Sequence, residues 1–136
     1  TDFYPTFLDV ANLPLRLDDH KDGISMLPLL NGTSKKLDRD TFYWHYPHYH
    51  RTKPYGAIRK GNYKLIQFFE DGRLELYDLS VDPNETHNIA VTQPEIASKL
   101  LENLKEWQVS VGAQMMKENP NYDVEKAAIK RKNKGM

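Results

Sequence analysis

Three histidines and an arginine lie close together near the middle of the chain, in a segment rich in aromatic residues. The segment reads Trp44-His45-Tyr46-Pro47-His48-Tyr49-His50-Arg51. Aromatic rings stack on sugar rings, and histidine and arginine side chains donate hydrogen bonds to anions such as sulfate. This set of side chains suits a sugar ring that bears a sulfate, with His45, His48, His50 and Arg51 as candidate binding residues. The alternative is a twisted aromatic strand whose polar tips are only solvated.

The same histidines are also common ligands of zinc and copper. On an unbroken strand His48 and His50 would share one face and His45 would not, although Pro47 loosens that rule. No local carboxylate completes a site unless Asp40 folds back, and we therefore expect no metal site. The chain also has no cysteine, which excludes thiolate ligands, a cysteine nucleophile and disulfides.

Composition argues against several other functions. The 136 residues carry 19 Lys and Arg against 19 Asp and Glu, so no overall positive field attracts nucleic acid or an anionic membrane. We expect no nucleic-acid partner. No apolar stretch approaches the roughly 20 residues that span a bilayer, and we expect no membrane span. No serine stands in a nucleophile elbow, and no glycine-rich phosphate loop is present.

The elements that must position the His-rich segment follow from the periodicity of the sequence. Strands are predicted at residues 41–46, 55–60, 63–69 and 73–79. Between the last two, Asp71-Gly72 predicts a hairpin with a two-residue primed turn. We therefore expect a small antiparallel sheet of about four strands, covered partly on both faces.

An amphipathic helix is predicted at residues 93–112, across one face of the sheet. Thr92-Gln93-Pro94-Glu95 has the spacing of a capping box. An apolar stripe follows it, made of Ile96, Leu100, Leu101, Leu104, Trp107 and Val111. Two short helices are expected earlier, within residues 2–13 with Asp2 as N-cap and within residues 25–30. The predicted fold class is α+β.

Motifs along most of the chain resemble those of type I, formylglycine-dependent sulfatases of the arylsulfatase kind. Residues 2–11 and 22–32 are similar to the end of the large α/β domain of that family. Four later motifs are similar to the small C-terminal subdomain of that family. They are Arg59-Lys60-Gly61-Asn62-Tyr63-Lys64-Leu65-Ile66, Glu75-Leu76-Tyr77-Asp78-Leu79, Asp82-Pro83-Asn84-Glu85 and Asn88-Ile89-Ala90. The resemblance runs from about residue 2 to residue 112. The His-rich motif is more similar to bacterial members than to animal ones.

The resemblance implies a division of the chain. Residues 1–36 would be the tail end of the large α/β domain, residues 37–116 the C-terminal subdomain, and residues 117–136 a charged, mobile tail. The parent protein would hydrolyse sulfate esters, on a sulfated carbohydrate, in a periplasm or outside the cell. The missing N-terminal α/β domain of the same chain and the sulfated sugar would be its partners.

The resemblance also implies that the catalytic centre lies elsewhere. The nucleophile of the family sits in a C/S-x-P-x-R motif, and no such motif occurs in this sequence. Formylglycine and calcium are therefore expected in the missing N-terminal part, with no cofactor and no catalytic residue in this fragment. We expect the fragment alone to be inactive.

Two other interpretations stay open from the sequence: a free-standing carbohydrate-binding domain and a purely structural domain. A C/S-x-P-x-R motif upstream would favour the sulfatase fragment. If the chain is a fragment, several apolar residues should be exposed or poorly packed because the large domain is missing. These residues are Phe3, Phe7, Leu8, Met26 and Leu30.

Overall fold

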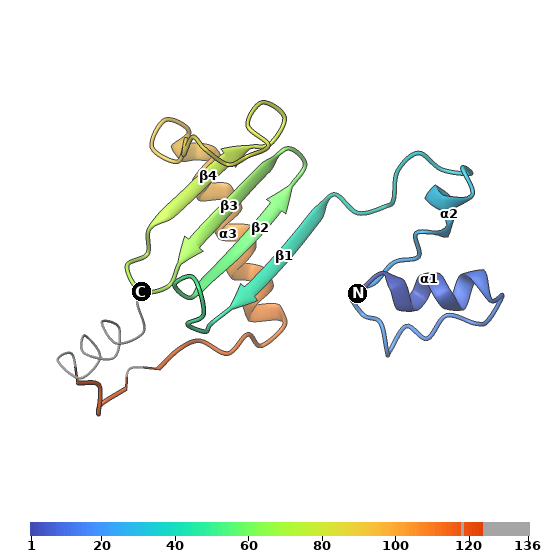
Figure 1. Ribbon diagram of the computed structural model, residues 1–136, viewed down its shortest axis with the longest axis horizontal. Coiled ribbons are helices and arrows are strands. Elements are labelled where there is room, and N and C mark those ends of the chain that lie inside the picture. Colours follow the sequence, from blue (N-terminus) through green and yellow to red (C-terminus); the bar gives the residue numbers. More distant parts are fainter. Residues whose placement is uncertain (118, 124–136) are drawn as a thin grey trace.

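A computed structural model describes residues 1–117 and 119–123 as two short helices, a four-stranded sheet and a long helix (Figure 1). The elements are α1 (Phe3–Val10), α2 (Leu27–Leu30), β1 (Thr41–Tyr46), β2 (Tyr55–Lys60), β3 (Tyr63–Phe68), β4 (Leu74–Asp78) and α3 (Pro94–Ser110). The predicted α+β class is confirmed. The tail expected at residues 117–136 lies for the most part outside the described residues.

The sheet has the strand order β1-β2-β3-β4, and every neighbouring pair is antiparallel. β2 and β3 are joined by a two-residue loop, because Lys60 pairs with Tyr63 across the turn. Gly61, the first loop residue, has φ +57°, a left-handed conformation that glycine adopts without steric cost. This loop is the tight hairpin of the sheet.

The hairpin predicted at Asp71-Gly72 exists, but the prediction that a two-residue primed turn closes it was wrong. Residues 69–73 form a longer loop, in which the Gly72 amide donates to the Phe68 carbonyl oxygen at 3.0 Å. Gly72 is the loop residue with positive φ, at +68°, whereas a type I′ turn needs positive φ at two successive positions. The Asp71 side chain instead accepts a hydrogen bond from the Arg73 amide at 3.1 Å.

The core lies between the sheet and α3, which passes behind the sheet in Figure 1. Ile58, Leu65 and Leu76 face each other on adjacent strands, and Leu104 of α3 packs against them; all four are 0% exposed. The buried line of α3 consists of Ala97, Leu100, Leu104 and Gln108. Of the predicted stripe, Leu100 and Leu104 are therefore central, whereas Val111 lies beyond the helix and is exposed.

The capping box predicted at Thr92 was wrong, whereas Asp2 is the N-cap residue of α1 as predicted. The Thr92 hydroxyl donates to the Ile89 carbonyl oxygen at 3.1 Å, and α3 begins at Pro94 with Gln93 as N-cap and no side-chain cap. Proline suits the first turn because the amide it lacks would have no partner inside the helix. The side chain of Asp2 makes no capping hydrogen bond to α1, because its carboxylate binds groups from more distant parts of the chain.

Asp2 joins three segments. Its carboxylate accepts hydrogen bonds from the Arg39 guanidinium, with Nη1 at 2.9 Å from Oδ1, and from the Ile24 amide at 3.2 Å. Arg39 lies in the linker to β1, and its guanidinium also stands 4.4 Å from the centre of the Phe42 ring. Arg39 therefore connects the N-terminal helices to the first strand.

This contact should make stability depend on pH. The hydrogen bond from Arg39, helped by the Ile24 amide, holds the pKa of Asp2 below its ordinary value. A carboxyl whose pKa is lowered by folding stabilises the fold above its ordinary pKa and loses that contribution as it is protonated. We expect the unfolding free energy to fall from about pH 5 downward, and to fall less steeply in Asp2→Asn. Urea unfolding at several pH values measures this slope; an unchanged slope in Asp2→Asn would contradict it, and Asp38→Asn is the matched linker control.

Large apolar side chains of the N-terminal helices are exposed, as expected for a fragment. Phe3 and Phe7 are 65% and 66% exposed, and Leu30 is also exposed, whereas Leu8 and Met26 are half-buried. The buried side of α1 carries Pro5 and Thr6 instead. The outer side of α1 thus presents an apolar surface that no described part of the chain covers.

Candidate functional site

The His-rich segment runs from β1 into an exposed loop, residues 47–54, at one end of the sheet. The loop that joins β3 to β4, residues 69–73, lies beside it, since the Phe69 amide donates to the Pro54 carbonyl oxygen at 3.0 Å. We refer to these two loops as the loop end of the sheet. Both are stretches of polar and aromatic residues between well-paired strands, and the rigid sheet sets their positions.

The two loops are fastened to each other by Glu70. Its carboxylate accepts a hydrogen bond from the Tyr49 hydroxyl and pairs with the Lys53 ammonium, with Nζ at 2.9 Å from Oε2. Lys53 also lies 3.6 Å from an Asp71 oxygen. The hydrogen bonds from Tyr49 and Lys53 hold the pKa of Glu70 below its ordinary value, so the carboxylate stays charged at neutral pH. Tyr49 and Lys53 flank His50 and Arg51, and this clasp therefore restrains the loop that carries them.

An aromatic row crosses the sheet next to the loop end, on the face away from α3. Tyr46, Tyr55 and Phe68 are neighbours on β1, β2 and β3, with ring centres 5.9 Å and 6.4 Å apart in turn. His48 meets Tyr46 edge-on at 5.7 Å, and the Arg73 guanidinium lies 4.0 Å above the Phe68 ring. The row thus has an imidazole at one end and a guanidinium at the other.

His45 lies apart from the other three candidates, on the face covered by α3. Its Nε2 is 2.8 Å from the Gln114 carbonyl oxygen, and its Nδ1 is 3.4 Å from the Gln108 amide nitrogen. A neutral ring protonated at Nε2 satisfies both contacts, because it donates to Gln114 and accepts from Gln108. The ring also rests 5.3 Å from that of Phe69. His45 therefore holds the segment after α3 against β1.

The structure thus places the four predicted site residues in two different locations. His48, His50 and Arg51 are all exposed and belong to one loop, whereas His45 is turned into the domain. Sequence reasoning missed Tyr55, Phe68 and Arg73 as members of the aromatic row. A signal existed, since Tyr46, Tyr55 and Phe68 share a face once the register of the two hairpins is known.

The described residues contain no group of three or more His, Cys, Asp or Glu that could hold a metal ion. A calcium ion takes six to eight oxygen ligands, and the residues present here do not fit one. No helix in the described ranges is long and apolar enough to cross a membrane.

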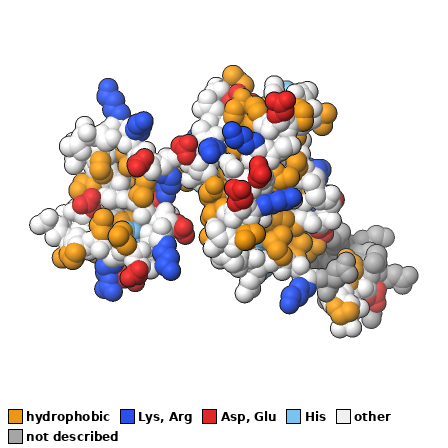
Figure 2. Space-filling view, turned by 180° about the vertical axis from the view of Figure 1, so that it is seen from behind, with side chains coloured by type: hydrophobic (Ala, Val, Ile, Leu, Met, Phe, Trp, Pro, Cys, Tyr) orange, Lys and Arg blue, Asp and Glu red, His pale blue; other side chains and the backbone are white. Residues whose placement is uncertain are grey.

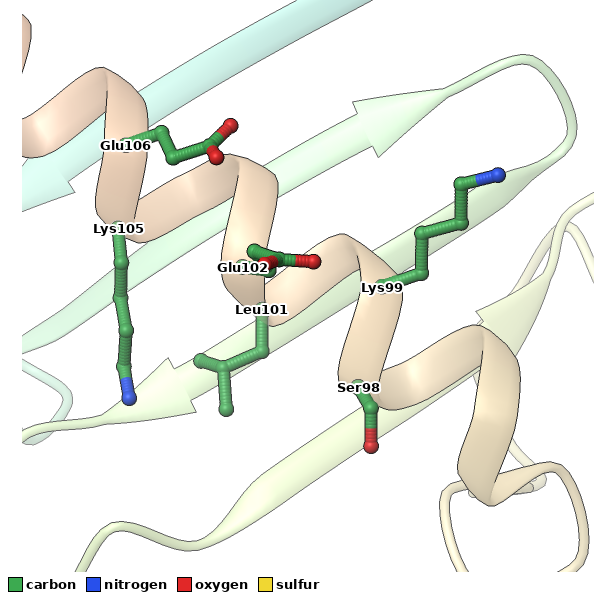
Figure 3. A pocket seen from close by; sticks show the side chains of 6 residues that line it. All are labelled: Ser98, Lys99, Leu101, Glu102, Lys105 and Glu106. Atoms are coloured by element: carbon green, nitrogen blue, oxygen red, sulfur yellow. The ribbon is translucent and has the colours of Figure 1, made fainter.

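A shallow depression lies far from these loops, on the outer face of α3. Figure 3 shows the residues that line it, and all come from this one helix: Ser98, Lys99, Leu101, Glu102, Lys105 and Glu106. Acidic and basic side chains alternate there, and those of Lys99 and Lys105 extend away from each other. This arrangement is typical of a solvated helix face rather than a binding site.

Solved structures share this fold. A putative sulfatase from Bacteroides thetaiotaomicron superposes on 88% of the chain with a TM-score of 0.72 at 24% identity, and the chain spans 27% of it. A second structure, described as a complex with its substrate D-glucosamine-2-N,6-O-disulfate, matches 79% of the chain with a TM-score of 0.64 at 35% identity, over 23% of its own length. A sheet backed by a C-terminal helix, with short helices before it, is thus the architecture of a sulfatase C-terminal region.

Sequence relatives agree with the structures. Arylsulfatase K of Rattus norvegicus is 37% identical over 115 residues, which cover 76% of this chain and 20% of the relative. An N-acetylglucosamine-6-O-sulfatase of Bacteroides thetaiotaomicron is 36% identical over 118 residues, which cover 78% and 21%. Residues 1–110 match the family described as N-sulphoglucosamine sulphohydrolase, C-terminal, and the chain belongs to that family. It spans about a fifth of the length of these relatives.

Proposed function

We propose that this chain is the C-terminal part of a sulfuric ester hydrolase that acts on a sulfated carbohydrate, and that its loop end contacts the sugar. The observation that carries the proposal is the exposed loop with His48, His50 and Arg51, which the Glu70 clasp restrains beside an aromatic row. Relatives over most of the chain are named as sulfatases, one of them for N-acetylglucosamine 6-O-sulfate. A similar structure at 35% identity is described with a disulfated glucosamine as its substrate.

The chemistry of the loop suits an anionic sugar. Arg51 supplies a permanent positive charge with several donors in one plane, and His48 and His50 add donors when protonated. The Tyr46 ring next to His48 offers a flat apolar surface against which a sugar ring can stack. A restrained loop loses less conformational entropy when a ligand binds, which favours recognition by groups held in place.

The catalytic groups belong to another part of the protein in this proposal. Formylglycine and calcium, which the family resemblance implies, would lie in an α/β domain before Thr1; when present they supply the nucleophile and the charge that binds the sulfate. The residues described here would bind and orient the sugar only. Within the chain, residues 1–36 would complete the large domain and residues 37–116 would form the C-terminal subdomain. We place the parent protein in a periplasm or outside the cell.

Replacing Arg51 or His48 by alanine in the full-length protein tests the proposal. We expect either substitution to lower kcat/KM on a 6-O-sulfated glucosamine about tenfold, since one hydrogen bond to the sugar is lost. Turnover of a small aryl sulfate should stay unchanged, because that substrate lacks the sugar. Steady-state kinetics on both substrates measure the difference.

Two controls complete this experiment. Lys99→Ala removes a charge from the outer face of α3, distant from the loop end, and should alter neither substrate. The 136-residue chain alone should give no turnover above the blank. Equal losses on the sugar and on the aryl sulfate would contradict sugar contact by the loop and would indicate an effect on stability or on the sulfate itself.

A further inference from the structure

The loop that joins β1 to β2, residues 47–54, has little of its own to fix its conformation. Every residue from His48 to Lys53 is exposed. The backbone hydrogen bond within the loop, from the His50 amide to the Thr52 carbonyl oxygen, is long at 3.4 Å. A segment with few buried contacts and few internal hydrogen bonds opens easily unless other groups hold it. The conformation of this loop therefore depends on contacts from outside it.

The neighbouring loop, residues 69–73, is held much more firmly. The Phe68 amide donates to the Arg73 carbonyl oxygen, and the Gly72 amide donates to the Phe68 carbonyl oxygen, both at 3.0 Å. The Arg73 amide donates to the Asp71 carboxylate at 3.1 Å, and the Arg73 guanidinium lies over the Phe68 ring. The β3–β4 loop is thus a well-bonded support beside a loosely bonded one.

Glu70 is the residue of this support that contacts the exposed loop at two places. Its Oε1 accepts a hydrogen bond from the Tyr49 hydroxyl, and its Oε2 lies 2.9 Å from the Lys53 ammonium. Asp71 adds a longer contact of 3.6 Å, and it reaches Lys53 only. Because each oxygen of Glu70 has a different partner, one carboxylate holds the loop on both sides of residues 50–52.

We propose that Glu70 is a positioning residue for sugar binding at the loop end, which holds the loop in the conformation that presents His48 and Arg51. The inference rests on the proposed function, because it takes the sugar to bind at this loop. Glu70 acts through Tyr49 and Lys53 and does not bind the sugar itself, since both its oxygens are engaged. A loop that is already ordered loses less conformational entropy when the ligand binds, so the clasp strengthens binding.

Replacing Glu70 by alanine in the full-length protein tests the inference. We expect KM for a 6-O-sulfated glucosamine to rise about fivefold while kcat changes less than about twofold, because binding must now order the loop. Tyr49→Phe and Lys53→Ala each remove one of the two contacts and should each raise KM about twofold. Glu70→Gln keeps an acceptor but loses the charge, and its KM should lie between those of Glu70→Ala and the unsubstituted protein. KM for a small aryl sulfate should stay unchanged in all four variants.

Glu102→Ala is the matched control, because Glu102 is an exposed glutamate on the outer face of α3. Figure 2 looks onto this side of the molecule, where acidic and basic side chains stand among apolar ones. Glu102→Ala should change KM for neither substrate. The unfolding midpoints of Glu70→Ala and Glu102→Ala should be similar, since exposed ion pairs contribute little to stability. A lower midpoint in Glu70→Ala with equal losses on both substrates would overturn the inference and leave Glu70 a role in stability only.

A mutant cycle shows whether Glu70 acts through the loop. In a protein that carries both His48→Ala and Arg51→Ala, the clasp has no sugar-binding side chain left to position. Adding Glu70→Ala to that protein should therefore leave KM for the sugar unchanged, which is the non-additivity expected of coupled residues. A further rise of about fivefold would overturn the inference, because Glu70 would then act independently of His48 and Arg51.

The same kinetics separate failure of this inference from failure of the proposed function. If Glu70→Ala leaves the sugar kinetics unchanged while His48→Ala and Arg51→Ala lower kcat/KM, the inference is overturned and sugar contact by the loop stands. If none of the three variants alters the sugar kinetics, both are overturned. A rise in KM that is confined to the sugar in Glu70→Ala and disappears in the double-variant background upholds both.

Discussion

Replacing Leu104 by alanine should lower the unfolding free energy of the chain by about 2–5 kcal/mol, the range for deleting a leucine from a packed core. Leu104 is 0% exposed and sits in the middle of α3, against Ile58, Leu65 and Leu76. The substitution leaves a cavity where the middle of the helix packs against the central strands. Since small domains are stable by only about 5–15 kcal/mol, the loss is a large fraction of the total.

Urea unfolding followed by far-ultraviolet circular dichroism measures this loss. Lys105→Ala is the matched control, because Lys105 is the next residue of α3 and its side chain is exposed. A shift of the unfolding midpoint as small in Leu104→Ala as in Lys105→Ala would mean that α3 does not form the core with the sheet. The slope of the transition should stay the same in both variants if the unfolded state is unaffected.

Replacing Asn88 by alanine should cost about 2–3 kcal/mol, because three hydrogen bonds depend on its side chain and each contributes roughly 1 kcal/mol. Its Oδ1 accepts from the amides of Leu76 at 3.0 Å and Ala90 at 2.9 Å. Its Nδ2 donates to the Leu74 carbonyl oxygen at 3.1 Å. Asn88 thus provides hydrogen-bond partners for backbone groups along the outer edge of β4. Beside it, the Ile89 amide donates to the Leu76 carbonyl oxygen at 2.9 Å.

Two further variants give this experiment its specificity. Asn84→Ala changes an exposed asparagine of the same loop and should have little effect on the unfolding free energy. Asn88→Asp keeps the acceptor but loses the donor to Leu74, so its cost should fall between those of the other two. If Asn88→Ala proves as stable as Asn84→Ala, water must supply the hydrogen bonds to the backbone groups at the edge of β4 instead.

The predicted elements agree with the structure where the sequence pattern is local. The two hairpins and the long helix follow from alternation, from Gly61 and Gly72, and from the apolar repeat around Leu104. The helix ends were less predictable. Thr92 has the spacing of a cap, but its hydroxyl bonds to Ile89 in the preceding turn. Asp2 precedes a helix, but Arg39 competes for its carboxylate from 37 positions away in the sequence.

The candidate site, too, was predictable only in its local features. Residue types alone identified the His-rich segment, and alternation along a strand already separated His45 from His48. They could not show that Glu70 fastens Tyr49 and Lys53, because that contact joins loops about 20 residues apart. Nor could they place Arg73 above Phe68, since that depends on how the longer loop after β3 folds.

The sequence by itself determined the class of this protein: an α+β chain with sulfatase C-terminal motifs, no cysteine and an exposed apolar surface on its first helix. Periodicity, turn residues and composition are local properties, and each can be read from a short window. The tertiary structure decided which face of the sheet α3 covers, and therefore which aromatic residues of β1 remain exposed. That choice depends on strand register and helix packing, which bring together residues such as Trp44 and Ile66 that lie far apart in the chain.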